Sequence, residues 1–513
     1  MDNASLAARL ARIADLLEAN RKNPANPWRI KAYRRAARSL ERHERSVADM
    51  LRQGEPLTSI PGIGAELGRL LEELATTGRA PLLDELEAQA PAKLPRRRAR
   101  PGGDAGIMLV QAEELAESLR AYLAPAAEQV VIAGDLRRKV ERIERIDLLV
   151  AAETSAPVLQ RLAAHAGLDE LHIDAGASRA TARLRGSLPI AVEIVEPERW
   201  GTALVEATGP PEHARAVTGR GDHATEADAY RAAGLPFIEP ELRAAGGSPE
   251  LLAARAGKLP RLVEANEIRG DLQMHTEWSD GNATVAQMAA ACRKRGYDYL
   301  AITDHSGSLT IANGLLPERL ERQWREIDEV RAAGPGIVLL KSMEVDILPD
   351  GSLDLPDDHL AELDCVLVAV HVQQKLPRRE QTARMLRAIA HPAVDILGHP
   401  TGRRGPRPSY DVDLEAVMRA CAEHDVAIEL DCSPARNDLS AANVRRALDL
   451  GCTVVIDTDA HAQRELEWMG FGVGQARRAW AQSDQILNAK RWPEMRRWLR
   501  RRGKRRGLDA LAG

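Results

Sequence analysis

Apolar residues recur with helical spacing along the first 90 residues. The stretches "SLAARLARIADLLEAN", "PWRIKAYRRAARSLERH" and "GAELGRLLEELATTG" each place apolar residues at positions i, i+3, i+4 and i+7. That spacing gathers the apolar side chains on one face of a helix. We therefore predict a small all-helical domain over residues 1–90.

The pattern changes after residue 90. Residues 91–106, "PAKLPRRRARPGGDAG", concentrate Pro, Gly and Arg without periodicity, which is typical of a linker. Residues 107–235 then combine helical segments with short β-type runs such as "QVVIAGDL", "IDLLVAA" and "PIAVEIVE". This mixture predicts a second domain of the α/β or α+β class.

The last region, residues 266–495, contains seven β-type runs, each with a polar residue at its end. The runs are "GDLQMH", "YLAITDH", "VLLKSMEVD", "CVLVAVH", "VDILGHP", "VAIELDC" and "CTVVIDTDAH". Helical patterns such as "TVAQMAAACRKRG" separate them. Repeated strand, polar tip and helix predict a parallel α/β barrel, in which the carboxyl ends of the strands meet at one end. We expect the polar tips to converge on one site.

The polar residues at these strand ends are imidazoles and carboxylates: His275, Asp280, His305, Glu344, His371, His399, Asp459 and His461. This is the ligand set of Zn²⁺, Mn²⁺ or Fe²⁺, and eight such groups exceed what one ion uses. A single histidine such as His399 is more often a core or loop residue. Eight at consecutive strand ends favour a centre with several metals.

Composition and charge predict where the protein is located and what kind of partner it binds. The 513 residues are 44% hydrophobic and 28% charged, with no apolar run long enough to span a membrane, no signal peptide and five cysteines without C-x-x-C spacing. We expect a cytoplasmic protein, monomeric, with reduced thiols. The formal net charge is −4, yet residues 1–100 hold 19 Lys and Arg against 13 Asp and Glu. This local excess predicts an anionic partner.

The barrel region resembles a known family. Its stretches "RGDLQMHTEWSDG", "YLAITDHS", "MEVDILPDGSLDLPD", "HPTGR", "SPARNDL" and "TDAH" are similar to the polymerase and histidinol phosphatase (PHP) domain at the C-terminus of bacterial family X DNA polymerases. The resemblance implies a distorted seven-stranded barrel with three divalent metals, Mn²⁺ or Zn²⁺. It implies one metal at Gln273, His275, Glu344 and Asp459, a second at Glu344, His371 and His399, and a third at Asp280, His305 and His461.

Gln273 departs from the family, which has the first histidine of H-x-H there. An amide oxygen is a weaker ligand than imidazole for borderline metals, although hard ions such as Mn²⁺ accept it. The two other sites keep every ligand, so we predict a working centre with one loosened metal. Adjacent metals support phosphoester hydrolysis. Arg403 in "HPTGR" is a candidate catalytic phosphate clamp, and a surface salt bridge is the alternative.

The N-terminal domain contains the helix-hairpin-helix motif "LTSIPGIGAELGRLLEEL". The turn formed by Pro61, Gly62, Ile63 and Gly64 can direct backbone N–H groups at a DNA phosphate. Such a contact binds DNA without reading its sequence. The alternative is an ordinary glycine-rich turn. The region resembles the lyase-type domain of family X polymerases, but Leu70 occupies the position of the family's reactive lysine. Leucine forms no Schiff base, so we expect DNA binding without lyase activity.

The middle region resembles the nucleotidyltransferase-like palm of the same polymerases, with losses at its active site. In "AGDLRRKVERIERIDLLVA", Asp135 replaces the serine that contacts triphosphate and Arg145 replaces the first catalytic aspartate. Asp147 and Glu193 remain. The family's "YFTGS" is "EATGP" at residues 206–210, and the second helix-hairpin-helix is missing. We therefore expect a degenerate palm that does not polymerise.

Two classes of function remain open. The first is a metal-dependent phosphoesterase acting on DNA, such as a 3′-5′ exonuclease or a 3′-end repair nuclease, with a small-molecule phosphatase as the alternative within this class. The second is a DNA-binding scaffold with an inert barrel. The eight retained barrel ligands favour the enzyme, and the basic helix-hairpin-helix favours DNA as the substrate.

Overall fold

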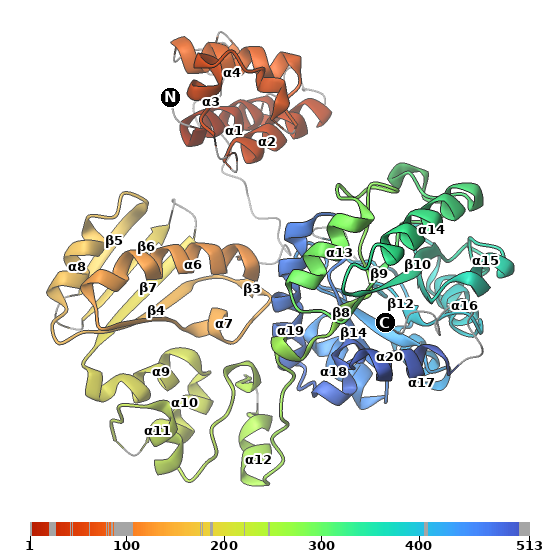
Figure 1. The fold of residues 1–513 in the computed structure, drawn as a ribbon. Coiled ribbons are helices and arrows are strands. Elements are labelled where there is room, and N and C mark those ends of the chain that lie inside the picture. Colours follow the sequence, from red (N-terminus) through yellow and green to blue (C-terminus); the bar gives the residue numbers. More distant parts are fainter. Residues whose placement is uncertain are drawn as a thin grey trace. The chain divides into compact units, whose positions relative to one another are not determined.

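The chain forms two compact units, Met1–Gly103 and Asp104–Gly513, drawn in Figure 1. The structure is a computed structural model. It describes residues 3–19, 27–41, 43, 45–60, 62–77, 80, 82–83, 86, 106–174, 176, 178–184, 188–219, 221–244, 247–404 and 409–501.

The first unit is all helical, as predicted. Its elements are α1 (Asn3–Ala19), α2 (Pro27–Glu41), α3 (Val47–Arg52), the 3₁₀ turn η1 (Leu57–Ser59) and α4 (Ala65–Thr77). Leu6 and Leu10 on α1 pack with Leu40, Leu71 and Leu74 in one buried apolar cluster. The helices therefore form because each buries its apolar stripe against the others.

A mixed sheet begins the second unit and has the strand order β2-β4-β7-β6-β5. β4 pairs with β7 in parallel, and the other pairs are antiparallel. The elements of this part are β1 (Ile107–Met108), α6 (Leu109–Leu123), β2 (Gln129–Ile132), α7 (Gly134–Arg137), β3 (Arg142–Ile143), β4 (Ile146–Ala151), α8 (Ala156–Ala163), β5 (Leu168–Asp174), β6 (Arg179–Leu184) and β7 (Leu188–Val195). α6 and α8 pack against the sheet (Figure 1), which agrees with the α/β prediction.

Four further helices follow this sheet: α9 (Trp200–Thr208), α10 (Pro211–Thr218), α11 (Glu226–Ala232) and α12 (Pro249–Arg255). A buried ion-pair cluster joins them to α7. Glu226 lies 2.5 Å from the guanidinium Nη2 of Arg137 and 2.9 Å from Nη1 of Arg243. Burial alone would raise the pKa of Glu226, but the two arginines lower it below its ordinary value.

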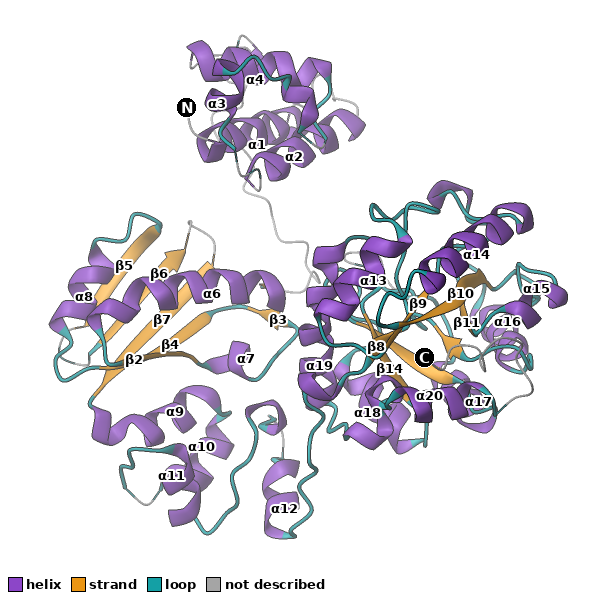
Figure 2. Cartoon of the chain, viewed as in Figure 1, coloured by secondary structure: helices purple, strands orange, loops and turns teal. Residues whose placement is uncertain are grey.

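The third predicted region is a seven-stranded parallel sheet in the order β14-β13-β12-β11-β10-β9-β8. Figure 2 shows its strands in orange with helices around them. All seven predicted strands are present: β8 (Gly270–Asp271), β9 (Tyr299–Ile302), β10 (Val338–Asp346), β11 (Cys365–Ala369), β12 (Ile396–Leu397), β13 (Ala427–Asp431) and β14 (Val454–Asp457). A parallel bridge between Met274 and Ala460 links the ends of β8 and β14 and nearly closes the barrel.

Helices follow the barrel strands and cover them: α13 (Val285–Lys294), α14 (Pro317–Ala332), α15 (Asp357–Glu362), α16 (Arg378–Ile389), α17 (Leu414–Glu423), α18 (Ala441–Asp449), α19 (Met469–Arg478) and α20 (Trp492–Leu499). The strands are buried on both faces, as a covered parallel sheet requires. The distorted barrel is therefore confirmed. The finer division of the second unit into residues 107–235 and 266–495 stays a prediction.

Within the part of the chain that the structure describes, no helix has the length and apolar character needed to cross a membrane. The five cysteines are free and buried.

Candidate metal centre

The carboxyl ends of the barrel strands bring the predicted ligands together. His275 and Asp280 follow β8, His305 follows β9, and Glu344 lies within β10. The others follow β11, β12 and β14 and are His371, His399, Asp459 and His461. Two groups among them place their ligand atoms within 4.8 Å of one another and can hold a metal ion.

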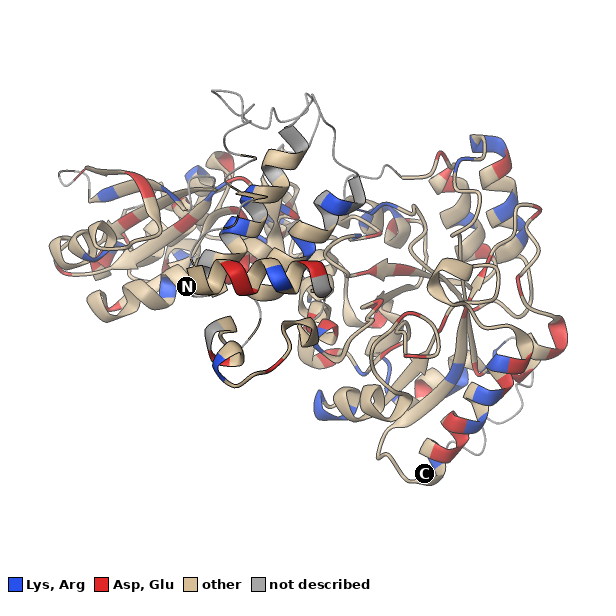
Figure 3. Cartoon of the chain, turned by 90° about the horizontal axis from the view of Figure 1, so that it is seen from above, with Lys and Arg blue, Asp and Glu red and all other residues tan. Residues whose placement is uncertain are grey.

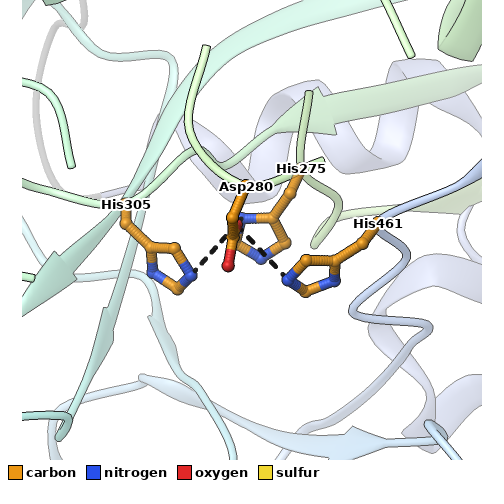
Figure 4. Close-up of side chains that lie close together, drawn as sticks. All are labelled: His275, Asp280, His305 and His461. Atoms are coloured by element: carbon orange, nitrogen blue, oxygen red, sulfur yellow. Dashed lines mark ion pairs between the residues drawn. The ribbon is translucent and has the colours of Figure 1, made fainter. Parts of the chain in front are cut away.

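The first group surrounds the carboxylate of Asp280 (Figure 4). Its Oδ1 lies 3.4 Å from His461 Nε2, 3.6 Å from His305 Nε2 and 3.8 Å from His275 Nδ1. These separations are longer than hydrogen bonds. Three nitrogens around one oxygen at this spacing leave room for a cation between them.

The second group surrounds Glu344. One carboxylate oxygen, Oε1, lies 2.7 Å from His399 Nε2 and 3.3 Å from His371 Nε2, and the other, Oε2, lies 2.9 Å from His305 Nδ1. Since His305 also faces Asp280, it joins the two groups. His275 Nε2 lies 2.9 Å from Oδ1 of Asp459, which brings the last strand to the same site.

The charges of the cluster suit metal ligands. Burial would raise the pKa of Glu344 and of Asp280, but the surrounding histidines lower the pKa of Glu344 well below its usual value and that of Asp280 to about 2. Burial also lowers the pKa of His371 well below its usual value. The carboxylates are therefore ionised and His371 is neutral at pH 7, as coordination requires. Burial would lower the pKa of His461, but Asp280 and Asp459 raise it to about 10, so this imidazole must lose a proton before it binds a metal.

Gln273 is buried, and neither its Oε1 nor its Nε2 has a hydrogen-bond partner among the residues that the structure describes. The same holds for Nδ1 of His275 and Nε2 of His371. A buried polar atom without a partner is costly unless a ligand or water satisfies it. These atoms therefore fit divalent cations, which would satisfy them.

Two further acidic residues accept hydrogen bonds from the backbone of ligand residues. Asp346 accepts a hydrogen bond from the backbone N–H of His371 at 2.9 Å, and Glu429 accepts one from the backbone N–H of His399 at 2.5 Å. Such outer groups hold the first ligands in place.

Arg436 was missed at the sequence level. Its Nε lies 3.1 Å from Oδ2 of Asp459 and 3.1 Å from Oδ2 of Asp431, and its side chain is buried. Arg436 belongs to "SPARNDL", one of the stretches that resemble the PHP domain, but nothing in that stretch indicates a role for this residue. Arg436 fixes the Asp459 carboxylate from the side opposite His275.

Arg403 lies outside both groups. Its Nη2 forms an ion pair with Oε1 of Glu141, in the segment between α7 and β3. This contact is the salt bridge that the sequence offered as the alternative, and its role as a phosphate clamp stays a prediction.

The predicted remnant of a polymerase site lies in a cavity of about 670 Å³. Asp147 on β4 and Glu193 on β7 line it from neighbouring strands, and both carboxylates are paired. Arg145 Nε lies 2.7 Å from Asp147, and Arg179 lies 3.0 Å from Glu193. Asp135, also in the lining, pairs with Arg138.

The helix-hairpin-helix turn precedes α4. Pro61 lies outside the described residues. Gly62 has a φ of +83°, which favours glycine, and Arg35 of α2 lies so close that a Cβ on Gly62 would meet its side chain at 3.2 Å. Leu70 packs against the apolar core of the unit. The turn therefore has a basic side chain beside it.

Comparison with known proteins finds matches to two family models and to a relative over nearly the full length of the chain. Residues 1–80 match a helix-hairpin-helix domain and residues 271–431 match a PHP domain. The chain is 30% identical over 555 residues to "DNA polymerase/3'-5' exonuclease PolX" of Bacillus subtilis (strain 168), which covers 93% of this chain and 96% of that protein.

Other relatives match a shorter part. A "Probable phosphatase" of Thermoanaerobacter sp. (strain X514) is 27% identical over 42% of this chain and 89% of its own length. A crystal structure of histidinol phosphate phosphatase from Lactococcus lactis, complexed with zinc, L-histidinol and phosphate, overlaps 40% of this chain and 93% of that one at 17% identity with a TM-score of 0.32. That overlap is too low to assign roles to residues here.

Proposed function

We propose that this chain, which belongs to the PolX family of DNA polymerase/3′-5′ exonucleases, is a metal-dependent phosphodiesterase that shortens DNA from a 3′ end and no longer polymerises. One observation carries the proposal. Glu344 lies within 3.3 Å of three histidine nitrogens, and His305 joins it to the group around Asp280. A buried set of ionised carboxylates and imidazoles is expensive to keep unless it binds metal.

The donor set favours up to three divalent ions, Mn²⁺ or Zn²⁺. Glu344 is placed to share ions between neighbouring sites, and Gln273 would complete the site that contains His275 and Asp459. Bound ions would supply Lewis-acid chemistry, which offsets the charge of a phosphodiester and makes water a better nucleophile. The chain itself holds the carboxylates ionised, and Arg436 keeps Asp459 in one orientation.

Loss of polymerisation is supported by the charges in the palm cavity. A polymerase site needs free carboxylates to bind Mg²⁺. Here Asp147 is already paired with Arg145, Glu193 is paired with Arg179, and Arg145 occupies the position of the missing aspartate. A metal approaching Asp147 would meet a guanidinium at contact distance.

The first unit is the proposed DNA anchor. The Gly62–Gly64 turn can present backbone N–H groups to phosphate, and the exposed Arg35 stands beside it. Acidic and basic residues of the second unit are instead mixed along its helices (Figure 3). A DNA substrate agrees with the cytoplasmic location that the sequence leads us to expect.

The test is digestion of an oligonucleotide that is labelled at its 5′ end. With Mn²⁺, a strand labelled at its 5′ end should give a ladder of shortened products, and EDTA should abolish it. Products that appear first as short labelled 5′ fragments would contradict 3′ polarity. Hydrolysis of a small phosphomonoester with intact DNA would instead support a phosphatase, and no hydrolysis of either substrate would support the inert scaffold.

A further inference from the structure

The loop between β9 and α14 displays apolar side chains to solvent. Ile311 is 93% exposed and Leu316 is 58% exposed, and Ile311 is the most exposed large hydrophobic residue in the described part of the chain. Their loop neighbours Ala312 and Leu315 are buried. The loop therefore has an anchored side and an outward apolar side.

Hydrogen bonds fix this loop to His305 and to the segment just before Asp280. The backbone N–H of Leu315 donates to the carbonyl of His305 at 2.7 Å, and the side-chain amide of Asn313 donates to the carbonyl of Trp278 at 3.1 Å. Gly314 has no room for a Cβ, which would overlap the Ser306 carbonyl. Ile311 is thus held at a defined position and does not sit on a free loop.

The open side of the metal centre lies beside the same loop. Among the ligands, the side chains of Asp280 and His461 are the more exposed, at 35% and 29%, while His275 and Glu344 are fully buried. The cluster is therefore more open to solvent on the Asp280 side than at Glu344. Asn313 also contacts the carbonyl of Ser279, the residue before Asp280, so the loop borders that more open side.

We propose that Ile311, with Leu316, forms a platform for the terminal nucleobase of a DNA strand whose phosphodiester lies at the metal centre. Nucleobases have apolar faces that pack on apolar and aromatic side chains, and such contacts tolerate any base. The inference rests on the proposed function and deepens it, because it separates nucleic acid ends from small phosphate esters.

The experiment compares three variants on two oligonucleotides of the same sequence. One oligonucleotide has an ordinary 3′-terminal nucleotide, and the other has an abasic sugar at that position. The variants are Ile311→Ser, the conservative Ile311→Leu and the control Leu252→Ser. Leu252 on α12 is also exposed, at 64%, but lies outside the barrel.

Ile311→Ser should lower kcat/KM on the ordinary end about tenfold, mainly through KM, in line with the usual strength of base stacking. On the abasic end it should match the wild type. Ile311→Leu should restore most of the loss, and Leu252→Ser should have no effect on either substrate.

Equal rates of wild type and Ile311→Ser on the ordinary end would overturn the inference. An equal loss on both ends would overturn it as well, because the effect would not then depend on a base. A wild type that shortens neither oligonucleotide would instead overturn the proposed function itself.

Discussion

Arg145 places its Nε 2.7 Å from Oδ1 of Asp147, so the arginine at the proposed position of a lost catalytic aspartate is paired with the carboxylate two residues along the chain. Burial raises the pKa of Asp147, and Arg145 offsets this effect only in part. The ion pair therefore compensates only part of the cost of burying the Asp147 carboxylate.

Because Arg145 is paired with Asp147, we expect that the protein does not extend a primer. The wild type should add no nucleotide to a primed template with Mg²⁺ or Mn²⁺, since the carboxylates of the cavity are occupied by arginines. The measurement is a gel assay with an active polymerase in the same buffer as a positive control. Incorporation that disappears in Asp147→Ala would contradict this expectation.

The metal cluster should act as one unit. His371→Ala and Asp459→Ala should each reduce DNA hydrolysis by about a thousandfold or more, and the double variant should be no worse than either, because groups that act together are not additive. His391→Ala, which changes a histidine paired with Asp357 outside the cluster, should keep wild-type activity. Multiplying losses in the double variant would argue for independent sites.

Gln273→His should tighten one metal. The buried amide atoms have no hydrogen-bond partner among the described residues, and an imidazole offers a stronger donor at that place. The variant should need less added Mn²⁺ or Zn²⁺ for half-maximal activity and should retain more metal after gel filtration, measured by mass spectrometry. An unchanged titration, with three metals already retained by the wild type, would show that Gln273 is not the weak ligand.

Deletion of residues 1–103 should weaken DNA binding and flatten its dependence on salt. The deletion removes one compact unit with its own apolar core and leaves the second unit whole. Each lost phosphate contact should reduce the slope of log K against log salt by about 0.9. A truncated chain with the full slope would place the DNA anchor elsewhere.

Glu226→Gln should destabilise the fold at pH 7 by about 3 kcal/mol, because Arg137 and Arg243 would lose their buried counter-ion. Since the pKa of Glu226 is lowered in the folded chain, its stabilisation is present above the ordinary carboxyl pKa and is lost as the pH falls through the lower folded value. The difference in unfolding temperature between the wild type and Glu226→Gln should therefore become smaller as the pH is lowered from 7 to 3. A constant difference would mean that the variant acts through packing.

The barrel strands and the convergence of their tips were predictable from the sequence. Parallel strands share one carboxyl end, so the sequence alone predicts that residues such as His275 and His399 come to the same site, where both lie near Glu344. Arg436 was not predictable, because its direction depends on how the segment after β13 turns back toward Asp459. The pairing of Arg403 with Glu141, 262 residues earlier, has no periodic signal either.

The bridge between Met274 and Ala460 has a consequence for protein synthesis. His275, which follows the first strand of the barrel, meets Asp459, which lies 184 residues later and follows the last strand. The part of the cluster that joins His275 to Asp459 therefore cannot form until β14 has been synthesised, whereas the histidines around Glu344 all precede that strand. A product that ends before β14 lacks Asp459 and His461 and so has an incomplete ligand cluster.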